Sequence, residues 1–417
     1  MRKVYTSIDI GTYSCKIVVC EYFNDKIHVL ASHCLDSKGI KKGLIVDPNL
    51  VVDTINEGIN EINSLLGINI KKVIVSVPDY NAKFKKVNGS VSINDSGIIN
   101  ATDINRVIKD SIYNKLDNDY ELVTVVPYLY LIDGNKEFGK PIGKNGQKLE
   151  IEGIMISTPK KNIYSVLSVL ERTGLEVVDI TIGGLASYYE VKDNNISKKV
   201  GAVVDFGHET TTVSIFDNDI LINSETLQIG GVNVERDISY VFGIRNSDAR
   251  IIKEKFASSH KRFCQLNEIY EVKNNNNEFI KLNQLEVSEV VMSRMVEIFS
   301  LVKKQIRLAS PKEIDYIVLT GGLTEFKSFK NLAYEVFGKD VMIHIVTTLG
   351  CRDNKYVNAL GMIKFFIDKM ESRGKEVSML SIEEETALIT PNNKLKKDNM
   401  IMNKIFGNMM AIKEDKR

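Results

Sequence analysis

The segment at residues 8–19, IDIGTYSCKIVV, decides the fold, because a segment of the same design recurs at residues 203–216, VVDFGHETTTVSIF. Each reads as a strand, an Asp-x-Gly turn, hydroxyl-bearing residues and a second strand. One such turn is common in hairpins and is weakly informative. Two copies indicate two similar halves of the chain that hold one nucleotide phosphate chain between them.

The residue types in both copies suit a phosphate ligand. Glycine permits a tight turn that brings backbone N–H groups close to an anion. Threonine and serine add hydroxyl donors. Asp9 and Asp205 stand at the strand ends, where a carboxylate can hold a hydrated divalent cation beside a phosphate.

A third candidate element is Gly321-Gly322-Leu323, which follows the apolar stretch 316–320. A pair of glycines at the end of a strand would let a flat adenine ring approach the backbone. A plain strand-to-helix turn explains the same residues equally well.

The totals describe an ordinary soluble globular chain of 417 residues, long enough for two or more domains. Hydrophobic residues make up 43% and the net charge is +1, so no general attraction to nucleic acid is expected. The cysteines contain no Cys-x-x-Cys pair and are expected to be reduced thiols. No signal peptide and no apolar run of about 18 residues is found, so we expect a cytoplasmic protein.

Strands alternate with helices along most of the chain, which indicates an α/β architecture. Residues 79–159 differ, with short strands, a helix near 103–115 and many glycines, and we expect an inserted subdomain there. Residues 371–397 are charged and polar and predict a flexible linker.

In chain order, these pieces resemble the actin-like ATPase superfamily, which also contains Hsp70 chaperones and sugar kinases. Residues 9–16 and 205–212 are similar to its two phosphate motifs, and residues 320–323 to its adenosine motif. Residues 182–187 and 356–361 fall where its two hinge segments lie. The resemblance implies an α/β, ribonuclease H-like fold of two lobes that binds ATP with Mg²⁺.

Within the superfamily, the chain resembles the FtsA family of bacterial division proteins. The stretches 127–150 and 229–253 carry this narrower resemblance, together with Arg294 and Glu297. It implies subdomain 1A at 1–80 and 161–199, an inserted 1C subdomain at 81–160, subdomain 2A at 200–230 and 313–354, subdomain 2B at 231–312, a return helix of 1A at 355–370, a linker at 371–398 and a C-terminal amphipathic helix at 399–413.

The resemblance also implies roles for individual residues. The phosphates would be bound by Gly11, Thr12, Ser14, Gly207, Thr210 and Thr211, with positive charge from Lys16. Asp9 and Asp205 would hold hydrated Mg²⁺. Gly321, Gly322 and Leu323 would line the adenine, and Lys253 the ribose side.

Four residues depart from the family pattern. The family usually has glycines where this chain has His208 and Glu209, a glutamate where it has Arg250, and a threonine where it has Glu235. A carboxylate at position 209 is unfavourable beside a γ-phosphate unless it points away or meets the cation. No catalytic base is assigned, so we expect weak ATP hydrolysis at most.

The C-terminal segment carries one apolar stripe at helical spacing, formed by Met402, Ile405, Phe406, Met409 and Met410. Such a helix can lie in the interface of an anionic membrane, although a helix that docks on its own domain is the plainer alternative. The resemblance favours membrane targeting and places the protein on the cytoplasmic face of the cell membrane, at the division site.

The implied partners are the C-terminal peptide of FtsZ, other copies of the chain in filaments or dimers, and further division proteins. A basic group on the expected helix 285–308 could face the acidic peptide, or could simply be a solvated helix face. This group comprises Arg294, Lys303, Lys304 and Arg307.

Two other readings of the core stay open. One is an actin-like pilus-assembly platform protein of the PilM type, which generally lacks such a tail. The other is a sugar kinase-like enzyme, which would need a catalytic aspartate facing the γ-phosphate.

Overall fold

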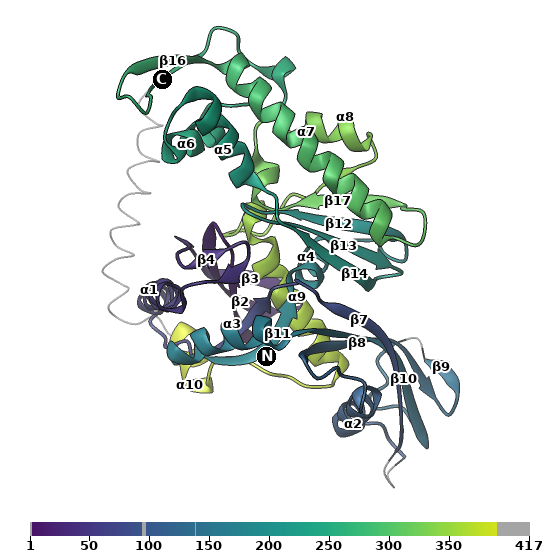
Figure 1. The fold of residues 1–417 in the computed structure, drawn as a ribbon. Coiled ribbons are helices and arrows are strands. Elements are labelled where there is room, and N and C mark those ends of the chain that lie inside the picture. Colours follow the sequence, from purple (N-terminus) through teal and green to yellow (C-terminus); the bar gives the residue numbers. More distant parts are fainter. Residues whose placement is uncertain (1, 94–96, 138, 390–417) are drawn as a thin grey trace, which may run out of the picture.

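Two five-stranded sheets form the frame of the molecule. The computed structural model describes residues 2–93, 97–137 and 139–389 (Figure 1). The apolar tail, with Met402 and Phe406, lies outside these residues. Among the described residues, no helix is long and apolar enough to cross a membrane.

The sheet of the first lobe has the strand order β11-β6-β1-β2-β3. Its strands are β1 (Lys3–Ile10), β2 (Ser14–Phe23), β3 (Lys26–Asp36), β6 (Lys72–Val77) and β11 (Glu176–Ile182). The first three strands form an antiparallel meander, and β6 and β11 continue the sheet in parallel. A small hairpin, β4 (Ile40–Lys41) with β5 (Leu44–Ile45), follows β3.

The sheet of the second lobe repeats this topology. Its order is β14-β13-β12-β17-β18, with the same meander of three strands followed by two parallel strands. The strands are β12 (Val200–Phe206), β13 (Thr211–Asp217), β14 (Ile220–Leu227), β17 (Tyr316–Thr320) and β18 (Met342–Ile343). The two halves predicted from the recurring Asp-x-Gly segment are therefore confirmed.

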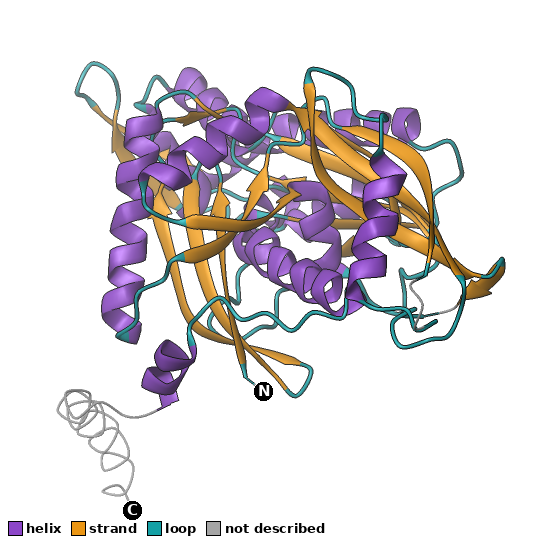
Figure 2. Cartoon of the chain, turned by 90° about the horizontal axis from the view of Figure 1, so that it is seen from below, coloured by secondary structure: helices purple, strands orange, loops and turns teal. Residues whose placement is uncertain are grey.

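Helices cover both faces of each sheet (Figures 1 and 2). In the first lobe they are α1 (Pro48–Leu66), α3 (Lys160–Arg172) and α9 (Val357–Ser372). Between the lobes lies α4 (Gly183–Val191), which packs against α9 and contacts β12 and β13. The second lobe has α5 (Gly231–Phe242), α6 (Asn246–Lys255), α7 (Gln284–Ala309), α8 (Phe329–Phe337) and the hairpin of β15 (Ile269–Lys273) with β16 (Phe279–Asn283).

Helix α1 shows why these segments are helical. Asp47 caps its start by accepting hydrogen bonds from the amides of Asn49 and Leu50, and Gly67 ends it in the left-handed conformation. Its apolar residues recur every three or four positions, so one face, including Ile55, is buried.

The insert forms a separate four-stranded sheet with the order β7-β10-β8-β9. It consists of β7 (Lys83–Ser92), α2 (Ala101–Ile112), β8 (Tyr120–Ile132), β9 (Asn135–Glu137) and β10 (Lys148–Pro159). Helix α2 packs on β7 and β10 around a small core of its own. Figure 1 shows this sheet extending away from the second lobe.

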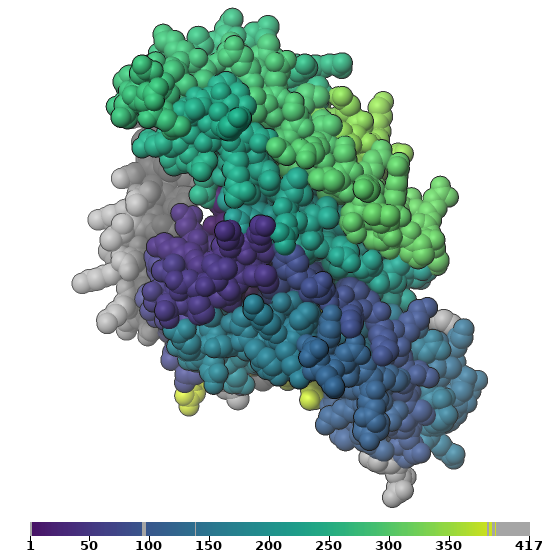
Figure 3. All heavy atoms as spheres, in the orientation of Figure 1, coloured from purple at the N-terminus to yellow at the C-terminus, as the bar shows by residue number. Residues whose placement is uncertain are grey.

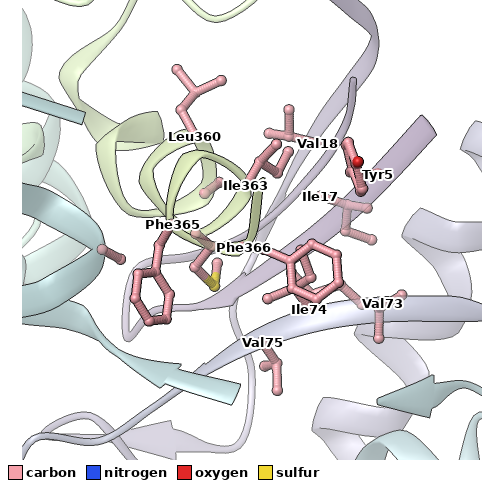
Figure 4. Packing of buried hydrophobic residues seen from close by; sticks show 14 of the residues in the cluster. Tyr5, Ile17, Val18, Val73, Ile74, Val75, Leu360, Ile363, Phe365 and Phe366 are labelled. Atoms are coloured by element: carbon pink, nitrogen blue, oxygen red, sulfur yellow. The ribbon is translucent and has the colours of Figure 1, made fainter. Parts of the chain in front are cut away.

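Helix α9 joins the C-terminal part of the chain to the first lobe. Leu360, Ile363 and Phe366 on α9 and residues of β1, β2 and β6 belong to one buried cluster (Figure 4). Tyr5 meets Phe366 edge to face, with ring centroids 5.7 Å apart. The first lobe is therefore built from both ends of the chain.

The expectation of a flexible linker from residue 371 is wrong for its first part. After α9, the Met379 amide donates to the Val4 carbonyl at 2.9 Å, and the Val4 amide donates to Ser378 Oγ at 3.0 Å. Met379 and Leu380 are buried against the first lobe, and a helix, α10 (Ile382–Ile389), follows. Two apolar residues give too short a pattern to predict this packing.

Candidate functional site

A cavity of about 460 Å³ lies between the two lobes, a size suited to a small-molecule ligand. Nearly all residues predicted to bind nucleotide line it. These are Asp9, Gly11, Thr12, Ser14, Lys16, Asp205, Gly207, Thr210, Lys253, Gly321, Gly322 and Leu323. The fold thus brings four distant segments of the chain to one place.

The two Asp-x-Gly turns have the same backbone geometry. In the first lobe the Gly11 amide donates to the Ser14 carbonyl at 3.2 Å, and in the second the Gly207 amide donates to the Thr210 carbonyl at 2.9 Å. The start of α5 supports the second turn, since the Gly231 amide donates to the Gly207 carbonyl at 3.1 Å. Each lobe therefore presents one turn to the cavity.

The prediction for the Thr211 side chain is wrong. Thr211 is fully buried, and its hydroxyl donates to the Ile229 carbonyl at 2.8 Å. Successive side chains of a strand point to opposite faces, so Thr210 and Thr212 face the cavity and Thr211 faces the core.

The acidic centre of the cavity consists of Asp9 and Asp205. Lys16 donates to Asp9 Oδ2 at 2.9 Å, and Asn358 Nδ2 donates to Asp205 Oδ2 at 3.0 Å. Desolvation, followed by the charge of Asp9, raises the pKa of Asp205 to about 6. A carboxyl group this reluctant to ionise fits a site that a hydrated cation would complete.

Lys16 is deeply buried beside these acids. Burial alone would lower its pKa, but the carboxylates of Asp9 and Asp205 raise it, and the net direction is upward. Its ammonium group therefore supplies a fixed positive charge beside the first turn.

The side of the cavity predicted to hold adenine is formed after β17. Gly321 has a φ of 93°, and a Cβ atom there would lie 2.2 Å from Asp205 Oδ1, so glycine is required. Leu323 lies near Gly231, which is also near the Lys253 ammonium group. Backbone and one apolar side chain thus line this side of the cavity.

The side chain of Lys253 is already paired with protein groups. Its ammonium group donates to Glu235 Oε1 at 2.5 Å, and His208 Nε2 lies 3.2 Å from the same oxygen. Desolvation would raise the pKa of Glu235, but these two partners lower it overall. The buried Glu235 and Lys253 and the half-buried His208 therefore form one network next to the cavity.

Asp79 is a lining residue that the sequence reasoning missed. Its carboxylate accepts hydrogen bonds from the amides of Gly183 and Gly184 at the start of α4, and from Ser224 Oγ in the second lobe at 2.7 Å. Desolvation raises its pKa. The sequence does contain a signal for this site. Asp79 closely follows the buried strand β6, just as Asp9 and Asp205 lie near the ends of β1 and β12.

The basic group on α7 is only partly available. Arg294 makes a two-pronged contact with Asp237, at 2.5 and 3.0 Å, and Lys303 donates to the Val336 carbonyl at 2.8 Å. Lys304 and Arg307 are exposed. The predicted membrane residues Met402, Ile405, Phe406, Met409 and Met410 lie outside the described residues.

Comparison with known protein families gives two matches on different parts of the chain. The model described as "Cell division protein FtsA" matches residues 202–361. The model described as "SHS2 domain inserted in FTSA" matches residues 81–157, which is where the insert lies.

Curated relatives extend this similarity over most of the chain. Cell division protein FtsA of Bacillus subtilis (strain 168) is 26% identical over 386 residues, covering 92% of this chain and 88% of the relative. Cell division protein FtsA of Enterococcus hirae is 27% identical and covers 87% of this chain and 83% of the relative.

Solved structures with a similar fold include the PilM–PilN type IV pilus biogenesis complex, with a TM-score of 0.58 and 13% identity over 86% of this chain and 97% of that one. MreB 5 of Spiroplasma citri bound to AMPPNP has a TM-score of 0.54 and 13% identity over 89% and 99% of the two chains. At this identity the likeness concerns the fold alone.

Two lobes of repeated topology, each presenting an Asp-x-Gly turn to one cavity, define a protein of actin-like fold. The insert and the sequence relatives narrow this further. The chain belongs to the FtsA family of cell division proteins.

Proposed function

We propose that the protein binds ATP with Mg²⁺ between its lobes, self-associates beneath the membrane, and links FtsZ to that membrane during division. The observation that carries the proposal is the pair of Asp-x-Gly turns facing one cavity in a chain of the FtsA family. The nucleotide-bound structures of MreB 5 support a nucleotide in such a cavity.

In this proposal the backbone amides and hydroxyls of the two turns bind the phosphates. Asp9 and Asp205 hold the water shell of Mg²⁺, whose charge would let Asp205 ionise. The role of the nucleotide is to set the relation between the lobes, with slow hydrolysis at most. The described residues that line the cavity provide acids there, but we assign none as a general base.

The tether requires an attachment at each end. We propose that residues 399–413 bind an anionic membrane surface as an amphipathic helix, and that the acidic FtsZ peptide contacts Lys304 and Arg307. Each buried large apolar side chain of the helix would contribute roughly 1.5–3 kcal/mol, so one helix binds reversibly and several copies in a filament bind firmly.

The test is co-sedimentation of FtsZ with anionic vesicles, using the full chain and a chain that ends at Lys397. FtsZ should sediment only with the full chain. Phe406→Glu should abolish sedimentation, whereas Asn403→Glu, which adds the same charge outside the apolar stripe, should weaken it much less. If FtsZ stays in solution with every form, the tether is wrong and the actin-like core stands alone.

The peptide contact is tested separately in solution. Lys304→Glu with Arg307→Glu should weaken binding of the FtsZ C-terminal peptide at least tenfold, because two favourable charge contacts become repulsive. Lys281→Glu, in the exposed hairpin at the opposite end of α7, is the control for reversing a surface charge and should change the affinity by less than about twofold. Equal effects of both changes would contradict a specific site on α7.

A further inference from the structure

Tyr13 lines the cavity between the lobes and touches three residues of the opposite lobe. It belongs to the first Asp-x-Gly turn, and its hydroxyl donates to Glu254 Oε1 on α6 at 2.8 Å. The His208 ring meets the tyrosine ring edge to face at 5.1 Å between centroids, and the Arg250 guanidinium lies 3.8 Å from the ring centroid. One first-lobe side chain is therefore held by a hydrogen bond, a ring contact and a cation–π contact.

A second contact crosses the cavity mouth at the β4–β5 hairpin. The Lys42 amide donates to the Glu209 carboxylate, and Lys42 Nζ donates to Gln228 Oε1 at 2.8 Å. Gly43 of this hairpin also lines the cavity. Figure 3 shows the N-terminal part of the chain, in purple, packed against the second lobe.

Three of the residues that make these contacts are ones that the resemblance marks as departures from the family pattern. His208 and Arg250 hold Tyr13, and Glu209 holds Lys42. The Glu209 carboxylate accepts from the first lobe, which explains how an acid is tolerated next to a phosphate-binding turn. The three side chains that replace the expected residues around the second turn thus share one role, which is to contact the first lobe.

We propose that Tyr13 and Lys42 are two latches that join the lobes over the nucleotide cavity and set the rate at which nucleotide enters and leaves. The proposal rests on nucleotide binding in this cavity, as proposed above. The contacts use protein groups only, so they would stabilise the closed arrangement of the free and the bound protein alike. A barrier of this kind slows association and dissociation together and leaves the affinity nearly unchanged.

The test measures association and dissociation rates of a fluorescent ATP analogue with Mg²⁺ by stopped flow, on the full chain. Tyr13→Phe removes the hydrogen bond to Glu254, and Glu209→Ala removes the acceptor for Lys42. Each change should raise both rate constants about threefold to thirtyfold, and the double variant should raise them further, with Kd within about threefold.

Matched controls separate the latches from general effects of substitution. Tyr164→Phe removes another exposed tyrosine–glutamate hydrogen bond, to Glu121 at 2.9 Å in the first lobe. Glu225→Ala removes an exposed carboxylate on β14. Neither should change either rate constant by more than about twofold. The proposal is overturned if the latch variants match these controls, or if only dissociation accelerates and Kd rises in proportion.

A second readout needs no nucleotide. Amide hydrogen exchange of residues 40–45 should become at least about fivefold faster in Glu209→Ala, because the Lys42 amide loses its acceptor and the hairpin can open. Unchanged exchange would overturn the latch. If exchange accelerates but the unaltered protein binds no nucleotide analogue, the latch stands and the proposed nucleotide function fails.

Discussion

Asp205 holds its proton to a higher pH than an ordinary aspartate because desolvation and the nearby charge of Asp9 disfavour its ionised form. Its pKa is raised from 3.8 to about 6. Between these values the folded protein binds more protons at this site than the unfolded chain does, so the free energy of unfolding falls as pH rises from about 4 to 6. The unliganded protein therefore carries an electrostatic penalty at neutral pH.

Asp205→Asn should remove that penalty. The amide can still accept from Asn358, and it carries no charge to desolvate. We expect the unliganded variant to gain roughly 1–3 kcal/mol of stability at pH 7.5 and almost nothing at pH 4, while binding of Mg²⁺-nucleotide is lost. Thermal unfolding at both pH values checks the first part, and titration with nucleotide checks the second.

Asp340→Asn, at an exposed aspartate of the same lobe, is the control for removing a negative charge. It should leave stability unchanged within about 0.5 kcal/mol at either pH. A gain for Asp205→Asn of the same size at both pH values would contradict the account of its pKa.

At the residue scale, sequence reasoning succeeded where the repeated motif fixes the backbone and failed where strand alternation decides which side chain faces the ligand. It placed Asp9 and Gly207 at the cavity but predicted the same for the buried Thr211. The cross-lobe contacts of Tyr13 could not be predicted, because they depend on how closely two distant segments approach.

At the element scale, the junction of α4 with α9 depends on one missing side chain. A Cβ atom at Gly361 would lie 1.8 Å from the Ala186 carbonyl oxygen. Backbone cannot move aside as a side chain can, so only glycine allows these two helices to approach so closely. Asn358, on the same helix, joins this junction to the cavity by binding both Ser187 and Asp205.

Gly361→Ala should force α4 and α9 apart. We expect a loss of about 2–4 kcal/mol in the free energy of unfolding, in spite of alanine's higher helix propensity. Because Asn358 would move with α9, nucleotide affinity should fall as well. Chemical denaturation and nucleotide titration measure the two effects.

Gly58→Ala is the matched control, since Gly58 also lies inside a helix. A Cβ atom there would come closest to the terminal methyl groups of Leu35 and Ile17, which can adopt other rotamers, and would meet no backbone atom among its three nearest neighbours. Its effect should stay within about 1 kcal/mol of zero. A smaller loss at Gly361 than at Gly58 would be inconsistent with the backbone contact.

Sequence periodicity located most elements, because buried strands and one-sided helices leave regular patterns. Helix α1, for example, runs from Pro48 to Leu66 with its apolar residues at helical spacing. The packing of Met379 and Leu380 was missed, because two apolar residues in a charged stretch have no period to detect.

At the scale of the whole molecule, the boundary of the folded core can be tested by shortening the chain. A chain that ends at Gly374 lacks Met379 and Leu380, which are buried against the first lobe. We expect it to lose about 3–5 kcal/mol and to expose apolar surface. A chain that ends at Lys397 should unfold like the full-length protein.

Circular dichroism melting curves and binding of a hydrophobic dye distinguish the two shortened chains. Equal stability of both would mean that the Met379 contact contributes nothing. The experiment also serves as a control for the vesicle co-sedimentation test, because it shows whether the chain that ends at Lys397 keeps a stable core.

The two-lobed plan could be predicted from the sequence because duplicated motifs require duplicated sheets. The position of the insert could not be predicted, because it depends on how its strands pack against β11, β14 and α3. The loop after β9 adds a contact between Lys140 and Glu371 on α9 at 2.7 Å.

The pairing of Val4 with Met379 also bears on how the protein is made. A ribosome releases the chain from the N-terminus, so the second sheet, contained within residues 200–343, and the insert, within residues 83–159, can each fold as soon as they emerge. Strand β1 is synthesised first, but part of its edge stays without a partner until synthesis is nearly complete. During that interval the backbone of β1 at Val4 stays open to pairing with another chain or to binding by a chaperone.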